Sequence, residues 1–207
     1  MTPAPGFVGF RFARRNRLLR RRLALLAAIF LVSLGLCPPD VAQQSKPEEY
    51  QVKAVYLYNF GRFVVWPGAA TAAQGTFDVC VMGRDPFGSA LDATLAGETI
   101  NNRKLAARRI AIPREATNCQ ILFISSSEAP RIKEILAAVG SSAVLTVSDM
   151  PAFTSNGGMI QFVLKENKVR FEVNLTAAEK AGLTLSSQLL KVATDVRKEP
   201  PGTSGHP

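Results

Sequence analysis

Histidine is almost absent from this chain, because the only one among 207 residues is His206, next to the C-terminal residue. A Ser-His-Asp triad or a Cys-His pair needs a histidine held inside the folded domain, so neither kind of catalytic site is expected. Zinc sites built from histidine or from paired cysteines are not expected either. The sequence therefore predicts a protein that is not an enzyme and that carries no metal and no cofactor.

The usual phosphate-binding motifs are also missing. Arg84 to Phe87 follow an apolar run as a nucleotide-binding loop would, but Gly83 and Gly88 do not form GxGxxG and no Walker lysine follows. The segment is better explained as a helix start in which Asp85 is the N-cap and Pro86 the first helical residue. No spacing of carboxylates points to a glycosidase pair.

Cysteine is scarce, with three residues in the whole chain. Cys37 lies in the N-terminal leader, which leaves Cys80 and Cys119, and neither belongs to a CxxC motif. Each lies in an apolar run typical of a buried strand. In an oxidising compartment the two thiols could form one bridge, and two buried free thiols are the alternative.

The formal charge of +9 comes mostly from one end of the chain. Residues 1–42 hold seven arginines and a single acid, so the remainder carries only about +3. The basic cluster at residues 103–109 lacks interleaved aromatic side chains, and nucleic-acid binding is not expected.

The same N-terminal stretch has the parts of a secretory signal. An arginine-rich segment is followed by an apolar run from Leu23 to Leu36 and a polar exit that contains proline. This run is shorter than the ~20 residues needed to span a bilayer. The sequence predicts a cleaved signal peptide over residues 1–42 and a periplasmic location, with an uncleaved inner-membrane anchor as the alternative.

The rest of the chain predicts one α/β domain over residues 48–196, after a linker at 43–47 and before a loose tail at 197–207. Strands that alternate with helices predict a single three-layer domain with a mainly parallel sheet between helices. A β-hairpin and a helix are expected at its C-terminal end. The predicted segments are a helix at 48–65, a strand at 77–82, a helix at 85–95, strands at 104–112 and 120–125, a helix at 130–139, a strand at 143–148, hairpin strands at 159–164 and 169–174, and a helix from 176 or 186 to 196.

Several segments in this region resemble the YfiR family of periplasmic regulators. They are Lys53 to Pro67 with Tyr58-Asn59-Phe60, Cys80 to Phe87, Cys119 to Ile124, Val144 to Asp149, Gly157 to Ile160, Val169 to Asn174 and Ser187 to Leu190. They occur in the family's order over about residues 48–196. The resemblance implies a Cys80–Cys119 disulfide, and Thr154 and Gln161 stand where some members carry a second cysteine pair.

The resemblance also implies a function and partners. YfiR-like proteins bind the periplasmic part of an inner-membrane diguanylate cyclase and hold it inactive, which restrains cyclic di-GMP signalling and biofilm formation. An OmpA-like outer-membrane lipoprotein relieves this inhibition, and a homodimer is a further expectation. A repressor of this kind needs only different affinities for the two states of its target, so no reactive residue is required.

Two sets of residues are candidates for binding. Arg170, Glu172 and Asn174 lie on the polar side of the second hairpin strand and are the candidate partner contacts. Arg84, Asp85 and Asp149 follow apolar strands, and in a parallel sheet such positions meet where ligands bind. They support the alternative function, a periplasmic small-molecule binding or sensor domain.

Overall fold

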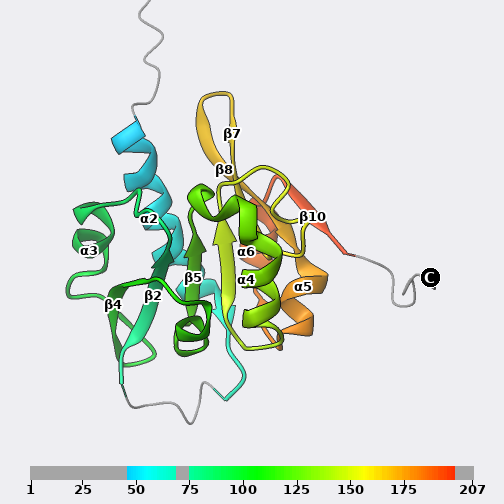
Figure 1. Cartoon of the computed structure of the whole chain (residues 1–207). Helices are drawn as coiled ribbons and strands as arrows, with labels where there is room; N and C mark the ends of the chain where they lie inside the picture. The colour runs from blue at the N-terminus through cyan, green and yellow to red at the C-terminus, as the bar shows by residue number, and fades with distance from the viewer. Residues whose placement is uncertain (1–45, 69–74, 199–207) are drawn as a thin grey trace, which may run out of the picture. The chain divides into compact units, whose positions relative to one another are not determined.

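The computed structural model describes residues 46–68 and 75–198, and the predicted signal peptide lies outside these ranges. An eight-stranded sheet forms the centre, in the order β10-β8-β7-β6-β5-β2-β4-β3 (Figure 1). Its strands are β2 (Phe77–Met82), β3 (Thr99–Ile100), β4 (Arg103–Ile110), β5 (Ile121–Ile124), β6 (Leu145–Ser148), β7 (Ile160–Lys165), β8 (Lys168–Asn174) and β10 (Asp195–Arg197). The neighbouring strands β4, β2, β5, β6 and β7 are all parallel to one another, which confirms the predicted mainly parallel sheet.

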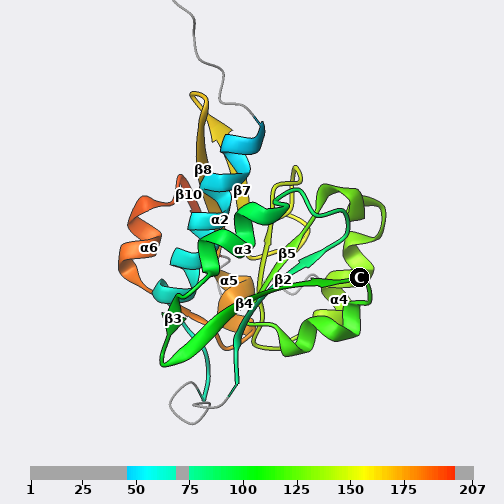
Figure 2. The same ribbon diagram turned by 90° about the vertical axis from the view of Figure 1, so that its left-hand side faces the viewer.

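Helices cover both faces of this sheet. Helices α2 (Lys46–Phe63), α3 (Ser89–Leu95) and α6 (Ser187–Val192) lie on one side and α4 (Ile132–Val139) on the other, as Figure 2 shows. Each face has its own apolar core. The first contains Leu57, Leu91 and Leu189, and the second contains Ile135 and Phe153. The strands between them are buried on both sides, as expected for parallel strands.

Helix α2 packs through a different stripe from the one that hydropathy predicts. Residues that recur at steps of three and four predict its apolar face, namely Val52, Val55, Tyr56, Asn59, Phe60 and Phe63. Val52 and Val55 are nevertheless 36% and 48% exposed. The buried residues of the helix are Lys53, Ala54, Leu57, Phe60 and Gly61. The buried stripe includes a lysine and a glycine, which hydropathy does not count as core residues. A Cβ at Gly61 would lie 2.5 Å from Ile100 Cδ1, so glycine allows α2 to approach β3.

The predicted helix at 85–95 starts later than expected. Helix α3 begins at Ser89, and Gly88 precedes it with a φ of 53° and no side-chain cap. Asp85 is therefore not an N-cap. Its Oδ1 accepts a hydrogen bond from the amide of Phe87 at 2.8 Å, which closes a turn between β2 and the helix.

The C-terminal region also differs from its prediction. The single final helix is two short helices, α5 (Leu175–Lys180) and α6, with β9 (Thr184–Leu185) between them. Strand β9 pairs antiparallel with β1 (Val64–Val65), directly after α2. Residues 195–197 form β10, an edge strand parallel to β8, which reaches one residue past the predicted domain end. Gly182, with a φ of 75°, ends the α5 segment because its conformation does not continue a helix.

The predicted hairpin is present. Strands β7 and β8 are antiparallel, and Lys165 pairs with Lys168 across a two-residue turn. Glu166 and Asn167 have φ values of 52° and 57°, as a type I′ turn requires.

A disulfide joins Cys80 to Cys119, with their Cα atoms 6.0 Å apart. Cys80 lies in β2, and Cys119 directly follows the 3₁₀ helix η1 (Pro113–Asn118) and precedes β5, the neighbour of β2. Both side chains are buried in the second core. The bridge therefore ties the central strand β2 to the connection that leads into the next strand.

Candidate functional site

The candidate partner contacts lie on the side of β8 that faces away from α2. Val169, Phe171 and Val173 point into the first core, whereas Arg170 is exposed and Glu172 is half-buried. Neither charged side chain forms an ion pair within the part of the chain that the structure describes. We call Arg170, Glu172 and their cross-strand neighbour Val163 the hairpin face. Its charges are available to a binding partner.

Asn174, the third candidate partner contact, has a structural role. Its Oδ1 accepts a hydrogen bond from the amide of Ala177 at 3.0 Å and so caps α5. Its Nδ2 donates to the carbonyl oxygen of Thr154 at 3.0 Å. Both ends of the amide are thus used inside the domain.

Asp149 belongs to a buried charged cluster where β6 ends. Its Oδ2 accepts from Lys53 Nζ at 2.6 Å and from the Tyr50 hydroxyl at 2.7 Å. Lys53 also pairs with Glu49, one helical turn earlier, at 2.5 Å. The Lys53 residue is only 3% exposed. We call Glu49, Tyr50, Lys53 and Asp149 the Lys53 cluster; it fastens the first turns of α2 to the edge of the sheet.

Tyr50 connects this cluster to the loop after β2. Its ring meets Phe87 edge-on at 5.4 Å between centroids and lies 4.3 Å from Lys53 Nζ. Burial of the hydroxyl raises the pKa of Tyr50, and the hydrogen bond to Asp149 raises it further, because ionisation would place two negative charges side by side.

Asp85 is paired with a different cation. Arg109, on β4, donates to Asp85 Oδ2 at 2.8 Å and to Asp92 of α3 at 2.7 Å. The guanidinium lowers the pKa of the Asp92 carboxyl, chiefly by this hydrogen bond. Arg84 is exposed, and its backbone amide donates to Ser127 Oγ at 2.9 Å.

The three candidate ligand residues lie at the same edge of the sheet but line different hollows. Asp85 lines one of about 760 Å³ together with Tyr50 and Phe87. Asp149 lines another of about 320 Å³, and Arg84 lines neither. The carboxylates of Asp85 and Asp149 are each neutralised by a cation of this chain, so ligand binding by this trio stays a prediction.

Sequence reasoning missed the partners of these carboxylates. Lys53 carried a signal that could have been used, because a lysine amid apolar residues with an acid four positions earlier suggests a buried i,i+4 pair. Arg109 carried none, because its pairing depends on the neighbouring positions of β2 and β4 in the sheet.

The described part of the chain contains neither a cluster of metal-ligating side chains nor a helix that could cross a bilayer. Across 46–68 and 75–198, no three metal-ligating side chains gather in one place. In the same ranges, no helix has the length and hydropathy needed to cross a bilayer.

Comparison with known proteins identifies the family. The family model described as YfiR/HmsC-like matches residues 50–194, most of the chain and nearly all of the described domain. The chain belongs to the YfiR/HmsC-like family. The family resemblance predicted from the sequence is thereby confirmed. YfiR-like proteins are periplasmic regulators of diguanylate cyclases, and the family is regulatory rather than catalytic.

Solved structures agree with the fold of this YfiR-like domain. A conserved domain protein from Vibrio cholerae O1 biovar El Tor superposes with a TM-score of 0.51 at 11% identity, over 72% of this chain and 60% of that one. An ABC domain from Streptococcus pneumoniae, in complex with L-Trp, gives a TM-score of 0.48 at 10% identity over the same shares. This chain therefore spans less than two thirds of either structure, and the Vibrio cholerae likeness supports the α/β fold alone.

Proposed function

We propose that this protein binds the periplasmic part of an inner-membrane diguanylate cyclase and holds the enzyme inactive. The match to the YfiR/HmsC-like family over residues 50–194 is the observation that carries this proposal. In this proposal the chain is exported by its cleaved signal peptide, acts in the periplasm and restrains biofilm formation. An OmpA-like outer-membrane lipoprotein releases the cyclase by sequestering the repressor, which functions alone or as a homodimer.

The hairpin face is the proposed contact surface. Arg170 and Glu172 are not neutralised by an ion pair of the described chain, and Arg170 lies opposite the half-buried Val163 on β7. A surface that combines unpaired charges of both signs with an apolar side chain suits recognition of one partner, because charge complementarity gives specificity. Asn174 is left out of the proposed contact because its amide already caps α5.

A reconstituted system tests this proposal. The full-length cyclase in lipid nanodiscs is assayed for cyclic di-GMP synthesis while the purified protein is added. The wild type is expected to lower the rate saturably. Arg170→Glu and Glu172→Lys are each expected to raise the half-inhibitory concentration about tenfold or more, since removing one partner of a buried interfacial charge pair costs at least ~2 kcal/mol.

Matched controls come from α4, where Lys133 and Glu134 are also an exposed basic residue and an exposed acidic residue close together. Lys133→Glu and Glu134→Lys make the same charge changes and are expected to inhibit like the wild type. If the α4 variants weaken inhibition as much as the hairpin-face variants do, the effect reflects charge in general. That result would contradict the hairpin face as the contact surface. Failure of the wild type to bind or inhibit the cyclase would overturn the repressor function itself.

The alternative function, a small-molecule sensor, has one structural observation in its favour. The hollow lined by Asp85, Tyr50 and Phe87 combines aromatic rings with a carboxylate at the carboxyl end of β2. Asp85→Asn should abolish ligand binding there while leaving cyclase inhibition unchanged, which separates the two functions.

A further inference from the structure

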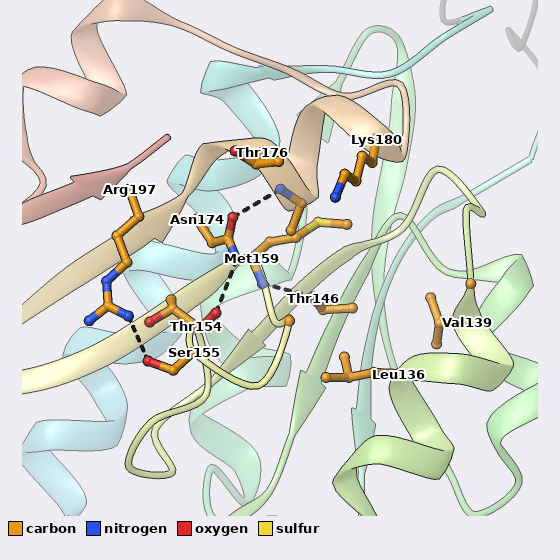
Figure 3. Close-up of a pocket in the computed structure, with 13 residues that line it drawn as sticks. Leu136, Val139, Thr146, Thr154, Ser155, Met159, Asn174, Thr176, Lys180 and Arg197 are labelled. Atoms are coloured by element: carbon orange, nitrogen blue, oxygen red, sulfur yellow. Dashed lines mark hydrogen bonds between the residues drawn. The ribbon is translucent and has the colours of Figure 1, made fainter. Parts of the chain in front are cut away.

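A third cavity is separate from the two hollows described above, and of the residues already discussed it is lined by Thr154 and Asn174. It has a volume of about 480 Å³, within the range of small-ligand sites. It opens between the C-terminal end of α4, the loop that precedes β7, helix α5 and strand β10 (Figure 3). Together with Thr146 of β6, residues from five separate segments of the chain therefore meet around one space on the α4 side of the sheet.

The walls of this cavity are divided by chemical type. Leu136 and Val139 of α4 form an apolar wall, and Met159, which is buried, adds a flexible apolar surface beside them. In Figure 3, Lys180 of α5 and Arg197 of β10 lie at two different sides of the rim, with Asn174 and Thr154 between them. The cavity thus has an apolar wall and a positively charged rim.

The charge of the lining is of one sign. Lys180 and Arg197 are its cations, and no aspartate or glutamate lines it. Lys180 forms no ion pair within residues 46–68 and 75–198. Arg197 pairs with Asp195 at 3.2 Å, an exposed pair of little strength, and donates to Ser155 Oγ at 2.6 Å. A negatively charged group would find cations here, and a positively charged one would find no counter-charge.

One buried polar atom at this cavity has no partner. Thr154 lines the cavity and is 2% exposed, and its Oγ1 makes no hydrogen bond in the described chain. Its backbone is fully used, because the amide donates to Gln161 Oε1 at 3.3 Å and the carbonyl accepts from Asn174. An unpaired buried hydroxyl costs free energy, and a ligand that bonds to it would remove that cost.

We propose that this cavity binds a small organic carboxylate with an apolar body. Lys180 and Arg197, from two sides of the rim, attract the carboxylate through their positive charge. Leu136, Val139 and Met159 contact the apolar body, and the Thr154 hydroxyl hydrogen-bonds to the ligand. The inference goes beyond the repressor function and does not depend on it, because it concerns a different surface from the hairpin face.

Calorimetric titration of the purified protein with three compounds of the same shape tests the charge. The probes are 4-phenylbutyrate, 4-phenylbutyramide and 4-phenylbutylamine, which are negative, neutral and positive; hexanoate and decanoate extend the series of carboxylates. Carboxylates are expected to bind at least about tenfold more tightly than the amide, and the amine not at all. Equal affinity for the three phenyl compounds, or no saturable binding of any carboxylate up to about 10 mM, would overturn the proposal.

Variants test the location. Lys180→Met and Arg197→Gln should each weaken 4-phenylbutyrate about tenfold, whereas Lys191→Met, an exposed lysine on α6, should leave its affinity unchanged. Thr154→Val keeps the shape and removes the hydroxyl, so it should weaken binding about fivefold even where it stabilises the free protein. Binding that survives Lys180→Met and Arg197→Gln intact, in variants whose melting temperatures show that they fold, would place the ligand elsewhere and refute the site.

Discussion

The Lys53 cluster offers the sharpest test of how α2 is attached to the sheet. The perturbation is Lys53→Met, which preserves the length of the side chain and removes its ammonium. Lys53 Nζ lies 2.5 Å from Glu49 and 2.6 Å from Asp149, and only 4% of the side chain is exposed. The substitution therefore leaves two carboxylates without their cation, and the side chains of Glu49 and Asp149 are only 15% and 12% exposed.

The expected cost follows from this burial. Removing one partner of a buried ion pair destabilises a protein by about 3–5 kcal/mol, because the remaining charge stays desolvated. Asp149 keeps the hydrogen bond from Tyr50, and its side chain is 12% exposed, which favours the lower end of the range. Adding Asp149→Asn to Lys53→Met should recover part of the loss, because the stranded charge is then gone.

Urea unfolding measures these free energies, with the fluorescence of Trp66 as the signal. Trp66 is the only tryptophan, is buried and packs edge-on against Phe77, so its emission should change on unfolding. The control Lys191→Met alters an exposed lysine and should change stability by less than about 0.5 kcal/mol. A cost below about 1 kcal/mol for Lys53→Met, or no recovery on adding Asp149→Asn, would refute the view that a dry ion pair holds α2 in place.

Three further predictions concern stability. The disulfide closes a separation of 39 residues. Replacing Cys80 and Cys119 by alanine should therefore lower the free energy of unfolding, measured by urea titration, by about 4 kcal/mol. A reductant should lower the stability of the wild type by a similar amount and have no effect on the double variant. The raised pKa of Tyr50 stabilises the neutral hydroxyl of the folded protein, so the stability advantage of the wild type over Tyr50→Phe should be full below pH 10, the ordinary pKa, and should shrink above it; an unchanged difference between pH 9 and 11 would contradict this. Gly158→Ala would press a Cβ into the buried ring of Phe153 and should cost about 1–3 kcal/mol, which thermal melts would show as a lower midpoint.

Local sequence patterns were sufficient to predict most of the helices and strands. The apolar run of β2, bounded by glycine, predicts a strand buried on both faces, and the structure has one there. The type I′ turn at Glu166 and Asn167 depends on two neighbouring residues, and the hairpin was predicted. The small number of cysteines allowed a Cys80–Cys119 bridge, the family resemblance implied it, and the structure contains it.

Patterns that depend on distant segments were not sufficient. The buried stripe of α2 was misassigned because Lys53 and Gly61 are buried by their neighbours, Asp149 and Ile100, which lie far away in the sequence. The strand β10 was missed because three exposed residues have no strand periodicity and pair only because β8 leaves an edge open beside them.

The sequence by itself determined the fold class and the family, since both rest on local hydropathy, residue identity or the order of motifs, and it indicated the disulfide only through the family resemblance. The tertiary structure alone decided which charges are neutralised and which stay available. Asp149 and Asp85 are paired because folding brings Lys53 and Arg109 beside them, whereas Lys180 and Arg197 both line a cavity whose lining contains no acid. Ion pairing acts over a few ångströms in space, and the distance along the chain does not predict it.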